Sequence, residues 1–156
     1  MQATFRLAGL EDLDLLLTFN REFCAFDRHP FDEATLRPAL DQLLRDHSLG
    51  RVWLIQDGAQ AIGYLVLAFG YSLEYRGRDA FVDEIYIRES HRRHGIGTQA
   101  FAFLEQECQV LGVRALHLEV EHRNVSARQF YSTVGFHDQE RHLMTRLIER
   151  LESSLV

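Results

Sequence analysis

The chain has 156 residues, 46% of them hydrophobic, and a formal net charge of −6. This length supports one complete core, and no segment rich in Pro, Gly or Ser divides it, so we expect a single domain over residues 1–156. The acidic balance argues against nucleic acid or an anionic membrane as the main partner and mildly favours cationic ligands. No signal-peptide pattern opens the chain and no apolar run approaches ~18 residues, which favours a cytoplasmic protein.

Hydrophobic periodicity predicts alternating strands and helices. Strands are expected at 4–7, 51–56, 61–71, 81–87, 115–120, 136–140 and 142–148. Helices are expected at 10–25, from a cap at Thr35 to about residue 45, at 98–111 and at 124–134. Asp57-Gly58 predicts a hairpin between the second and third strands. The order predicts an α/β fold with a mixed, mostly antiparallel sheet of about seven strands and about four helices, with one parallel crossover between the fourth and fifth strands.

Two kinds of potential metal ligand show no site pattern. Cys24 and Cys108 each lie on an apolar helical stripe, so we expect buried free thiols and not a disulfide. The eight histidines have no ligand spacing, and no metal is expected.

Residues 81–98, FVDEIYIRESHRRHGIGT, carry the main signal for function. A β-branched and aromatic run leads through a basic connector to a glycine pair that opens a helix. The first turn of a helix has free N–H groups and partial positive charge, and glycine lets a phosphate approach the backbone closely. We therefore expect a pyrophosphate site, formed by Arg92, Arg93, His94, Gly95, Ile96, Gly97 and Thr98.

Two other nucleotide sites deserve comparison with this pattern. A Walker P-loop is excluded because it needs a lysine, and all seventeen basic residues are arginines. A Rossmann-like dinucleotide-binding domain remains an alternative, because residues 95–100 fit G-x-G-x-x-A and Glu119 or Glu121 lies at roughly the expected distance. Against it, seven residues separate Ile87 from Gly95, whereas the first Rossmann glycine follows its strand almost directly.

The motif Arg92-x-x-Gly95-x-Gly97 after a strand with acidic residues resembles the (Q/R)-x-x-G-x-(G/A) signature of the GNAT N-acetyltransferase superfamily. A second block follows in the matching order: residues 116–120, then Asn124-x-x-Ala127-x-x-Phe130-Tyr131-x-x-x-Gly135-Phe136. Within the superfamily, Tyr71-Ser72-x-x-Tyr75-x-Gly77-Arg78 followed by the paired acids of strand 82–87 resembles the diamine and thialysine acetyltransferase subgroup.

This resemblance implies a fold, a co-substrate and several roles. The fourth and fifth strands are expected to splay apart and admit the pantetheine arm of acetyl-CoA, which pairs with Ile85, Tyr86 and Ile87. The matching asparagine, Asn124, is expected both to cap its helix and to contact the cofactor. Family members tend to form homodimers, which we also expect here.

The reaction needs one proton acceptor and one proton donor. An alkylammonium (pKa ~10.4) must lose a proton before it attacks a thioester, and the leaving thiolate gains from a donor. Asp83 and Glu84 are adjacent on a strand, whose pleat points them to opposite faces. Either can be the base, and the other carboxylate, with Glu22, can hold a second positive charge of the substrate. Tyr131, a phenol of pKa ~10, is the proposed acid.

The sequence thus predicts acetylation of a small cationic primary amine, such as a polyamine or thialysine, by direct attack in a ternary complex. A protein or peptide amine is the alternative acceptor. A non-catalytic acetyl-CoA-binding module is the alternative to an enzyme.

Overall fold

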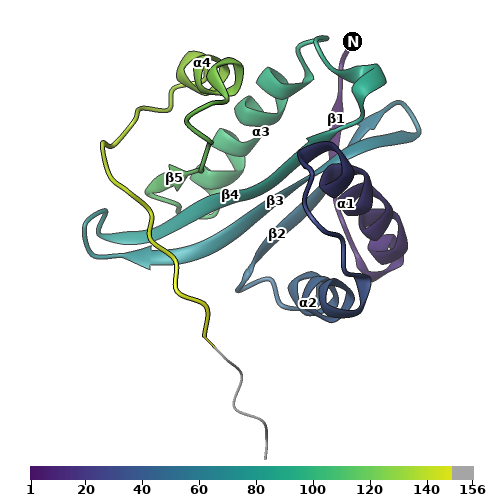
Figure 1. Cartoon of the computed structure of the whole chain (residues 1–156), viewed down its shortest axis with the longest axis horizontal. Helices are drawn as coiled ribbons and strands as arrows, with labels where there is room; N and C mark the ends of the chain where they lie inside the picture. The colour runs from purple at the N-terminus through teal and green to yellow at the C-terminus, as the bar shows by residue number, and fades with distance from the viewer. Residues whose placement is uncertain (149–156) are drawn as a thin grey trace, which may run out of the picture.

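A five-stranded sheet in the order β1-β2-β3-β4-β5 organises the structure, a computed structural model that describes residues 1–148 (Figure 1). Neighbouring strands from β1 to β4 are antiparallel, and β4 and β5 are parallel. The parallel crossover and the Asp57-Gly58 hairpin are therefore confirmed. The strands are β1 (Thr4–Leu7), β2 (Gly50–Asp57), β3 (Gln60–Ser72), β4 (Gly77–Ile87) and β5 (Ala115–His117).

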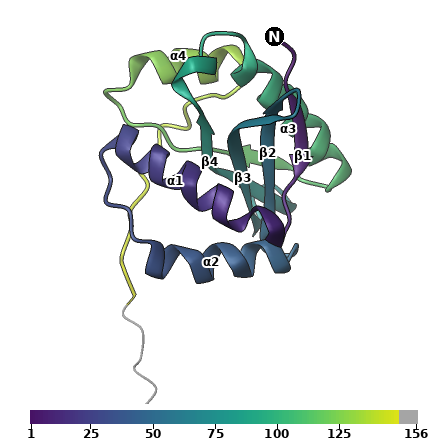
Figure 2. The same ribbon diagram turned by 90° about the vertical axis from the view of Figure 1, so that its right-hand side faces the viewer.

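Helices cover both faces of this sheet, as Figure 2 shows. They are α1 (Leu13–Asp27), α2 (Glu33–Arg45), α3 (Ile96–Val110) and α4 (Val125–Thr133). On one face, α1 and α2 pack on β2, β3 and β4 around the fully buried Phe19 and Leu54. On the other, α3 packs around Leu65, Leu67 and Leu104. The three-layer arrangement places β4 between two apolar cores.

The predicted strand count is wrong. Residues 136–148 form no strand in the part of the chain that the structure describes, so the sheet has five strands and not about seven. The segment runs past the β3–β4 hairpin, where Arg141 forms an ion pair with Glu74 at 2.9 Å. Met144 and Leu147 are almost fully exposed. The segment has the apolar pattern of a strand, but a strand also needs the edge of another strand as a partner. Within residues 1–148, no strand pairs with this segment.

The start of α2 also differs from the prediction. The cap is Asp32, not Thr35: the Asp32 carboxylate accepts a hydrogen bond from the Ala34 amide at 3.1 Å. The helix therefore begins earlier and includes Pro38. Proline removes the hydrogen bond to the carbonyl of Ala34, and this is tolerated because both residues are exposed to water.

Two features of β4 prepare the site. Pairing with β5 is limited to Asp79, Ala80 and Phe81, so β4 separates from β5 beyond this point. This confirms the expected splay. In addition, the β3–β4 register shifts between Val66 and Leu67, which pair with Glu84 and Val82, so Asp83 has no partner on β3. Such a bulge redirects side chains locally.

The topology excludes the dinucleotide-binding alternative. A Rossmann sheet is built of parallel strands around the strand that precedes the glycine turn. Here that strand is β4, whose long neighbour β3 is antiparallel to it.

Both cysteines are free, as expected. Cys108 is buried, and burial raises the pKa of its thiol to about 11, whereas Cys24 is half-buried. Within residues 1–148, no helix is both long and apolar enough to cross a membrane.

Candidate functional site

The connection from β4 to α3 is the turn at which the sequence predicts anion binding. Gly95 caps α3 with φ 77° and Arg93 also has positive φ, 63°, so the chain reverses sharply before the helix. The amide of Gln99 donates to the carbonyl of Gly95 at 3.1 Å, which closes the first helical turn. The three preceding amides, of Ile96, Gly97 and Thr98, point out of the helix start and have no intrahelical acceptor.

The free edge of β4 offers peptide groups next to this turn. The amide of Arg88 donates to the carbonyl of Ile62 at 2.9 Å. In an antiparallel pair, hydrogen-bonded and non-hydrogen-bonded positions alternate, so the peptide groups of Ile87 and Ile85 point away from β3. The peptide groups of Tyr86 point toward β3. Of the three predicted strand contacts, Ile85 presents free backbone groups and Ile87 presents a free amide, because the Ile87 carbonyl accepts a hydrogen bond from Arg92. Tyr86 presents only its side chain.

A groove of about 260 Å³ runs between this edge, α1 and the start of α3. Its walls are mainly aromatic, and Gly97 lies on its floor close to Phe130: a Cβ at this glycine would stand 3.0 Å from the Phe130 ring. Close packing and close ligand approach therefore both require glycine here. The groove is lined by Phe23, Phe26, Ile85, Tyr86, Ile87, Arg92, Gly97 and Phe130.

The predicted cationic residues of the turn have different environments. Arg92 is half-buried: its Nε donates to the carbonyl of Ile87 at 2.7 Å, and its guanidinium lies over the Phe26 ring at 4.0 Å. Arg93 and His94 are exposed at the turn. Arg92 thus fastens the turn to β4 and α1, while Arg93 and His94 are accessible to an anion.

Glu84 is the carboxylate that the structure draws into the interior. Oε2 accepts a hydrogen bond from the Tyr64 hydroxyl at 2.5 Å, and the Asn20 amide donates to Oε1 and Oε2 at 3.1 and 3.0 Å. Burial raises the pKa of Glu84 above its ordinary value, and the negative charge of Asp83 acts in the same direction, while the two donors oppose them. Glu84 is therefore a partly desolvated carboxylate with a fixed orientation.

The other two predicted acids are placed differently. Asp83, at the bulge, is exposed. Glu22 was expected to bind substrate, but both of its oxygens are engaged by Arg88, at 2.8 and 3.0 Å, and its Oε2 also accepts from the Tyr86 hydroxyl at 3.1 Å. These hydrogen bonds, that from Arg88 foremost, lower the pKa of Glu22. The negative charge of Glu22 is thus already paired with Arg88 in this structure, and its predicted role in substrate binding stays a prediction.

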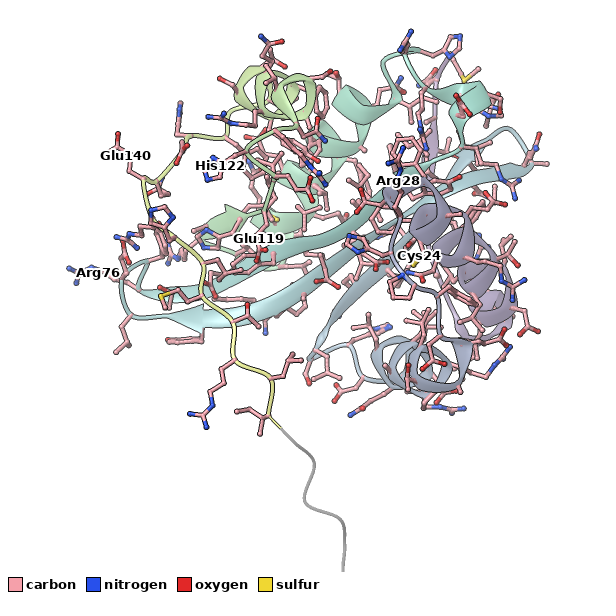
Figure 3. The ribbon with its side chains drawn as sticks, in the orientation of Figure 1. Cys24, Arg28, Arg76, Glu119, His122 and Glu140 are labelled. Atoms are coloured by element: carbon pink, nitrogen blue, oxygen red, sulfur yellow. The ribbon has the colours of Figure 1, made fainter. Side chains whose placement is uncertain are left out.

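A second cavity, of about 370 Å³, opens on Glu84 from the side of α1 and α2. In Figure 3, Cys24 on α1 marks the side of β4 on which this cavity lies. Glu119 and His122, on the connection from β5 to α4, mark the other side of β4. Most of the lining is apolar, with a carboxylate at Glu84 and another at Asp32. The lining residues are Asn20, Cys24, Pro30, Phe31, Asp32, Thr35, Leu36, Ala39 and Glu84.

These features are a splayed strand edge, a glycine turn and a partly buried carboxylate that lines the second cavity, and they can be compared with known proteins. The model of the acetyltransferase (GNAT) family matches residues 14–136, most of the chain. The chain belongs to the GNAT family.

Individual relatives agree with this assignment. The uncharacterized N-acetyltransferase YycN of Bacillus subtilis (strain 168) is 33% identical over 67 residues, 43% of this chain and 43% of that protein. The match thus spans less than half of the length of this curated relative. The integron cassette protein HFX_CASS3, from the mobile metagenome of Cole Harbour Salt Marsh, is 33% identical with a TM-score of 0.83, covering 94% of this chain and 91% of the other. A predicted acetyltransferase with acetyl-CoA from Clostridium acetobutylicum shares the fold, with a TM-score of 0.77 at 20% identity, covering 93% and 96% of the two chains.

Asn124 and Tyr131 are the two predicted site residues at helix α4, one at its N-cap and one within the helix. Asn124 caps α4, because its Oδ1 accepts from the Ala127 amide at 3.1 Å; the capping prediction is confirmed. Tyr131 is half-buried, with its ring packed edge-on against Phe101 and Phe136. Burial raises the pKa of its phenol, which keeps the proton on oxygen at neutral pH. Within residues 1–148, the Tyr131 hydroxyl makes no hydrogen bond to protein.

Sequence reasoning missed Asn20 and Tyr64. Asn20 lies in the apolar stripe of α1, one turn after Leu16, and Tyr64 lies in a strand of apolar residues. Both are buried, at 6% and 2% exposed. A polar group at a core position needs a hydrogen-bonding partner, so each position carried a signal that a polar cluster lies beneath α1.

We expect Gly97→Val to weaken coenzyme A binding at least tenfold, or about 1.4 kcal/mol, because a branched side chain fills the space between Phe130 and an approaching pyrophosphate. Calorimetric titration measures the dissociation constant, and the melting temperature checks that the fold survives. Gly77→Val at the opposite end of β4 is the matched control, since a Cβ there meets only the flexible Arg114 side chain at 3.1 Å. An unchanged dissociation constant for Gly97→Val would contradict the assignment of the turn.

Proposed function

We propose that this GNAT protein is an acetyl-CoA-dependent N-acetyltransferase whose acceptor is a small primary amine with a second cationic end. The observation that carries the proposal is Glu84: one titratable carboxylate, held by two donors, opens onto the second cavity and belongs to the same strand whose free edge continues to the pyrophosphate turn. Family membership and the GNAT structure described with acetyl-CoA support the co-substrate.

The residues around the first groove fit acetyl-CoA. The amides at the start of α3, with Arg93 and His94, suit the two phosphates. The peptide groups of Ile85 and the amide of Ile87 suit the amides of the pantetheine arm. The aromatic groove walls suit its apolar portions. When bound, acetyl-CoA supplies an activated acyl group as a thioester.

Glu84 is the general base of the proposal. An alkylammonium is protonated at neutral pH and must lose a proton before its nitrogen has a lone pair for attack. A carboxylate whose pKa is raised by burial is a better match for this task than an exposed one, because its proton affinity is closer to that of the amine. Asp83, exposed at the bulge, adds negative charge that favours a cation and strengthens the basicity of Glu84.

The second cavity supports a slender acceptor. Its walls, formed by Pro30, Phe31, Leu36 and Ala39, suit a methylene chain, and Asp32 supplies a carboxylate on the side of α2. An amine with an aliphatic spacer and a second positive charge matches a cavity with a carboxylate at Glu84 and another at Asp32. This chemistry agrees with the diamine or thialysine class that the Tyr71 to Arg78 motif resembles, with Asp32 in place of Glu22 as the anchor.

Tyr131 is the proposed acid. Its protonated phenol donates to the departing thiolate, and its position on α4, across the β4–β5 opening from α1, agrees with that role. The proposal retains the cytoplasmic location and the homodimer expected from the sequence. Sedimentation of the purified protein measures its oligomeric state.

The direct test is an acetyl-CoA turnover assay over polyamines, thialysine, lysine, aminoglycosides and peptides. Preferred acetylation of small diamines supports the proposal. If only peptides were acetylated, the acceptor would be a peptide amine and not a small diamine. Coenzyme A binding without any turnover would indicate a non-catalytic module.

The pH dependence distinguishes the two neighbouring acids. Glu84 accepts a proton only when ionised, so kcat/KM rises with pH through the raised pKa of Glu84 and then levels off. Glu84→Gln removes the base and should lower kcat by about 10²-fold or more. Asp83→Asn removes a negative charge that raises the pKa of Glu84, so the rising limb should move to lower pH. Unchanged profiles for both variants would rule out this assignment of the base.

Tyr131→Phe removes one hydroxyl at almost constant volume. If that hydroxyl protonates the leaving thiolate, kcat should fall roughly 10²-fold with little change in coenzyme A affinity or melting temperature. Steady-state kinetics and a thermal melt measure these quantities. Phe136→Leu, which disturbs the same aromatic cluster, serves as the packing control; a wild-type kcat in Tyr131→Phe would make Tyr131 a packing residue.

Asp32→Asn tests the acceptor anchor. Asparagine caps helices about as well as aspartate, so α2 keeps its start while the cavity loses a negative charge. KM for a diamine should rise several-fold, by the ~1 kcal/mol typical of a solvent-accessible ion pair, whereas KM for a monoamine of equal length should stay nearly constant. Equal effects on KM for both amines would show that Asp32 does not bind the second positive charge of the diamine.

A further inference from the structure

We propose that Tyr64 and Asn20 are positioning residues that clamp Oε2 of Glu84, so that Oε1 is the atom that takes the proton from the acceptor amine. This inference rests on the proposed role of Glu84 as the base and adds how the fold prepares that base.

The two oxygens of Glu84 have unequal surroundings. Oε2 accepts the short bond from the Tyr64 hydroxyl, at 2.5 Å, and a bond from the Asn20 amide at 3.0 Å. Oε1 has only a 3.1 Å contact, with the same Asn20 nitrogen. The Asn20 nitrogen lies at nearly the same distance from both oxygens, so the Tyr64 hydroxyl makes the difference between them: Oε2 has one more donor, and Oε1 keeps more acceptor capacity. A proton that leaves the ammonium nitrogen therefore forms its new O–H bond on Oε1, which neutralises the carboxylate.

The clamp is built from separate elements whose placement is fixed by the core. Tyr64 pairs with Tyr86 and Glu84 pairs with Val66, so Tyr64 and Glu84 are diagonal neighbours on one face of the sheet, within reach of long side chains. Asn20 lies on α1, and its side-chain nitrogen also donates to the Tyr64 hydroxyl at 3.2 Å. The Tyr64 ring lies 6.1 Å from that of Phe19.

The clamp has a defined protonation state. Burial, with the charge of Glu84, raises the pKa of Tyr64 far above its ordinary value, so Tyr64 remains a donor over the working pH range. Cys24 on α1 faces the cluster: its thiol contacts the Asn20 oxygen at 3.4 Å, and burial first, then Glu84, raises its pKa. Asp83 on the same strand and Asp32 beside α2 are the other charges near Glu84.

Removing either donor should raise the pKa of Glu84, because both donors favour its ionised form. Tyr64→Phe deletes the hydroxyl and keeps the ring, and Asn20→Leu deletes the amide at similar volume. Carbon-13 NMR of the glutamate carboxyl groups measures the Glu84 titration directly, with Glu84→Gln to assign the signal. Tyr86→Phe is the matched control: it removes a neighbouring hydroxyl that is bonded to Glu22 and not to Glu84, so the Glu84 midpoint should not move.

Kinetics with the preferred amine provide the second measurement. In Tyr64→Phe and Asn20→Leu, the rising limb of kcat/KM should move to higher pH together with the NMR midpoint, and much of the lost rate should return at high pH. A purely structural role would lower the rate at every pH and leave the limb in place.

The results separate two failures. An unchanged Glu84 midpoint in both variants overturns the clamp, whatever the acceptor proves to be. A shifted midpoint with an unshifted rate limb overturns its part in proton transfer and also removes Glu84 as the proposed base. Because the NMR titration needs no substrate, it decides the clamp even if no amine in the panel is acetylated.

Discussion

The short pairing between β4 and β5 is the constraint on which the site depends. Three residue pairs join these strands, and beyond them β4 continues to Ile87 with β3 as its strand partner and no strand on its other edge within residues 1–148. Backbone groups left without partners are costly in a protein interior, so an unpaired edge persists only where solvent or a ligand can reach it. The parallel crossover to β5 must leave from the end of β4, which places the glycine turn and the start of α3 beside the free edge.

A second constraint is the energetic balance at Glu84. Removing a carboxylate from water costs several kcal/mol, while a hydrogen bond to a charged group returns about 1.5–3 kcal/mol. The two donors therefore offset much of the cost without cancelling it, and the pKa of Glu84 stays raised. More donors would lower the pKa of Glu84, and fewer would raise it further. The β-bulge at Asp83 contributes by exposing the neighbouring acid to solvent instead of burying two like charges.

Local patterns in the sequence were sufficient for the elements that surround the glycine turn. Strand, basic connector and helix follow one another within about twenty residues, and each is set by neighbours in the chain. The C-terminal strands were predicted by the same criteria and are absent, because strand formation is decided by a partner edge that no local pattern describes. The turn and the splay were predictable; the number of strands was not.

The side chains of the site divide in the same way. Gly95 and Asn124 act through the conformation of their own segment, which sequence reasoning can reach. The partners of Glu84 and Glu22 lie 20 to 66 residues away, and the competition between Arg88 and a substrate for Glu22 appears only when α1 is placed on the sheet. Long-range pairing therefore decided which of the three candidate acids faces the second cavity.

Helix α1 links the two halves of the site. Its last two turns contribute Phe23 and Phe26 to the first groove, and Asn20 and Cys24 to the second cavity. Glu22 joins the same stretch to Arg88 at the end of β4, and Arg92 stacks on Phe26 while it bonds to Ile87. Helix α1 thus contributes to both cavities. It is held to β4 and the residues just after it by the Glu22–Arg88 ion pair, by hydrogen bonds from Asn20 to Glu84 and from Tyr86 to Glu22, and by cation–π contacts of Arg88 and Arg92. A shift of α1 toward or away from β4 would change the groove beside the glycine turn and the donors to Glu84 together, because the same rigid element carries both.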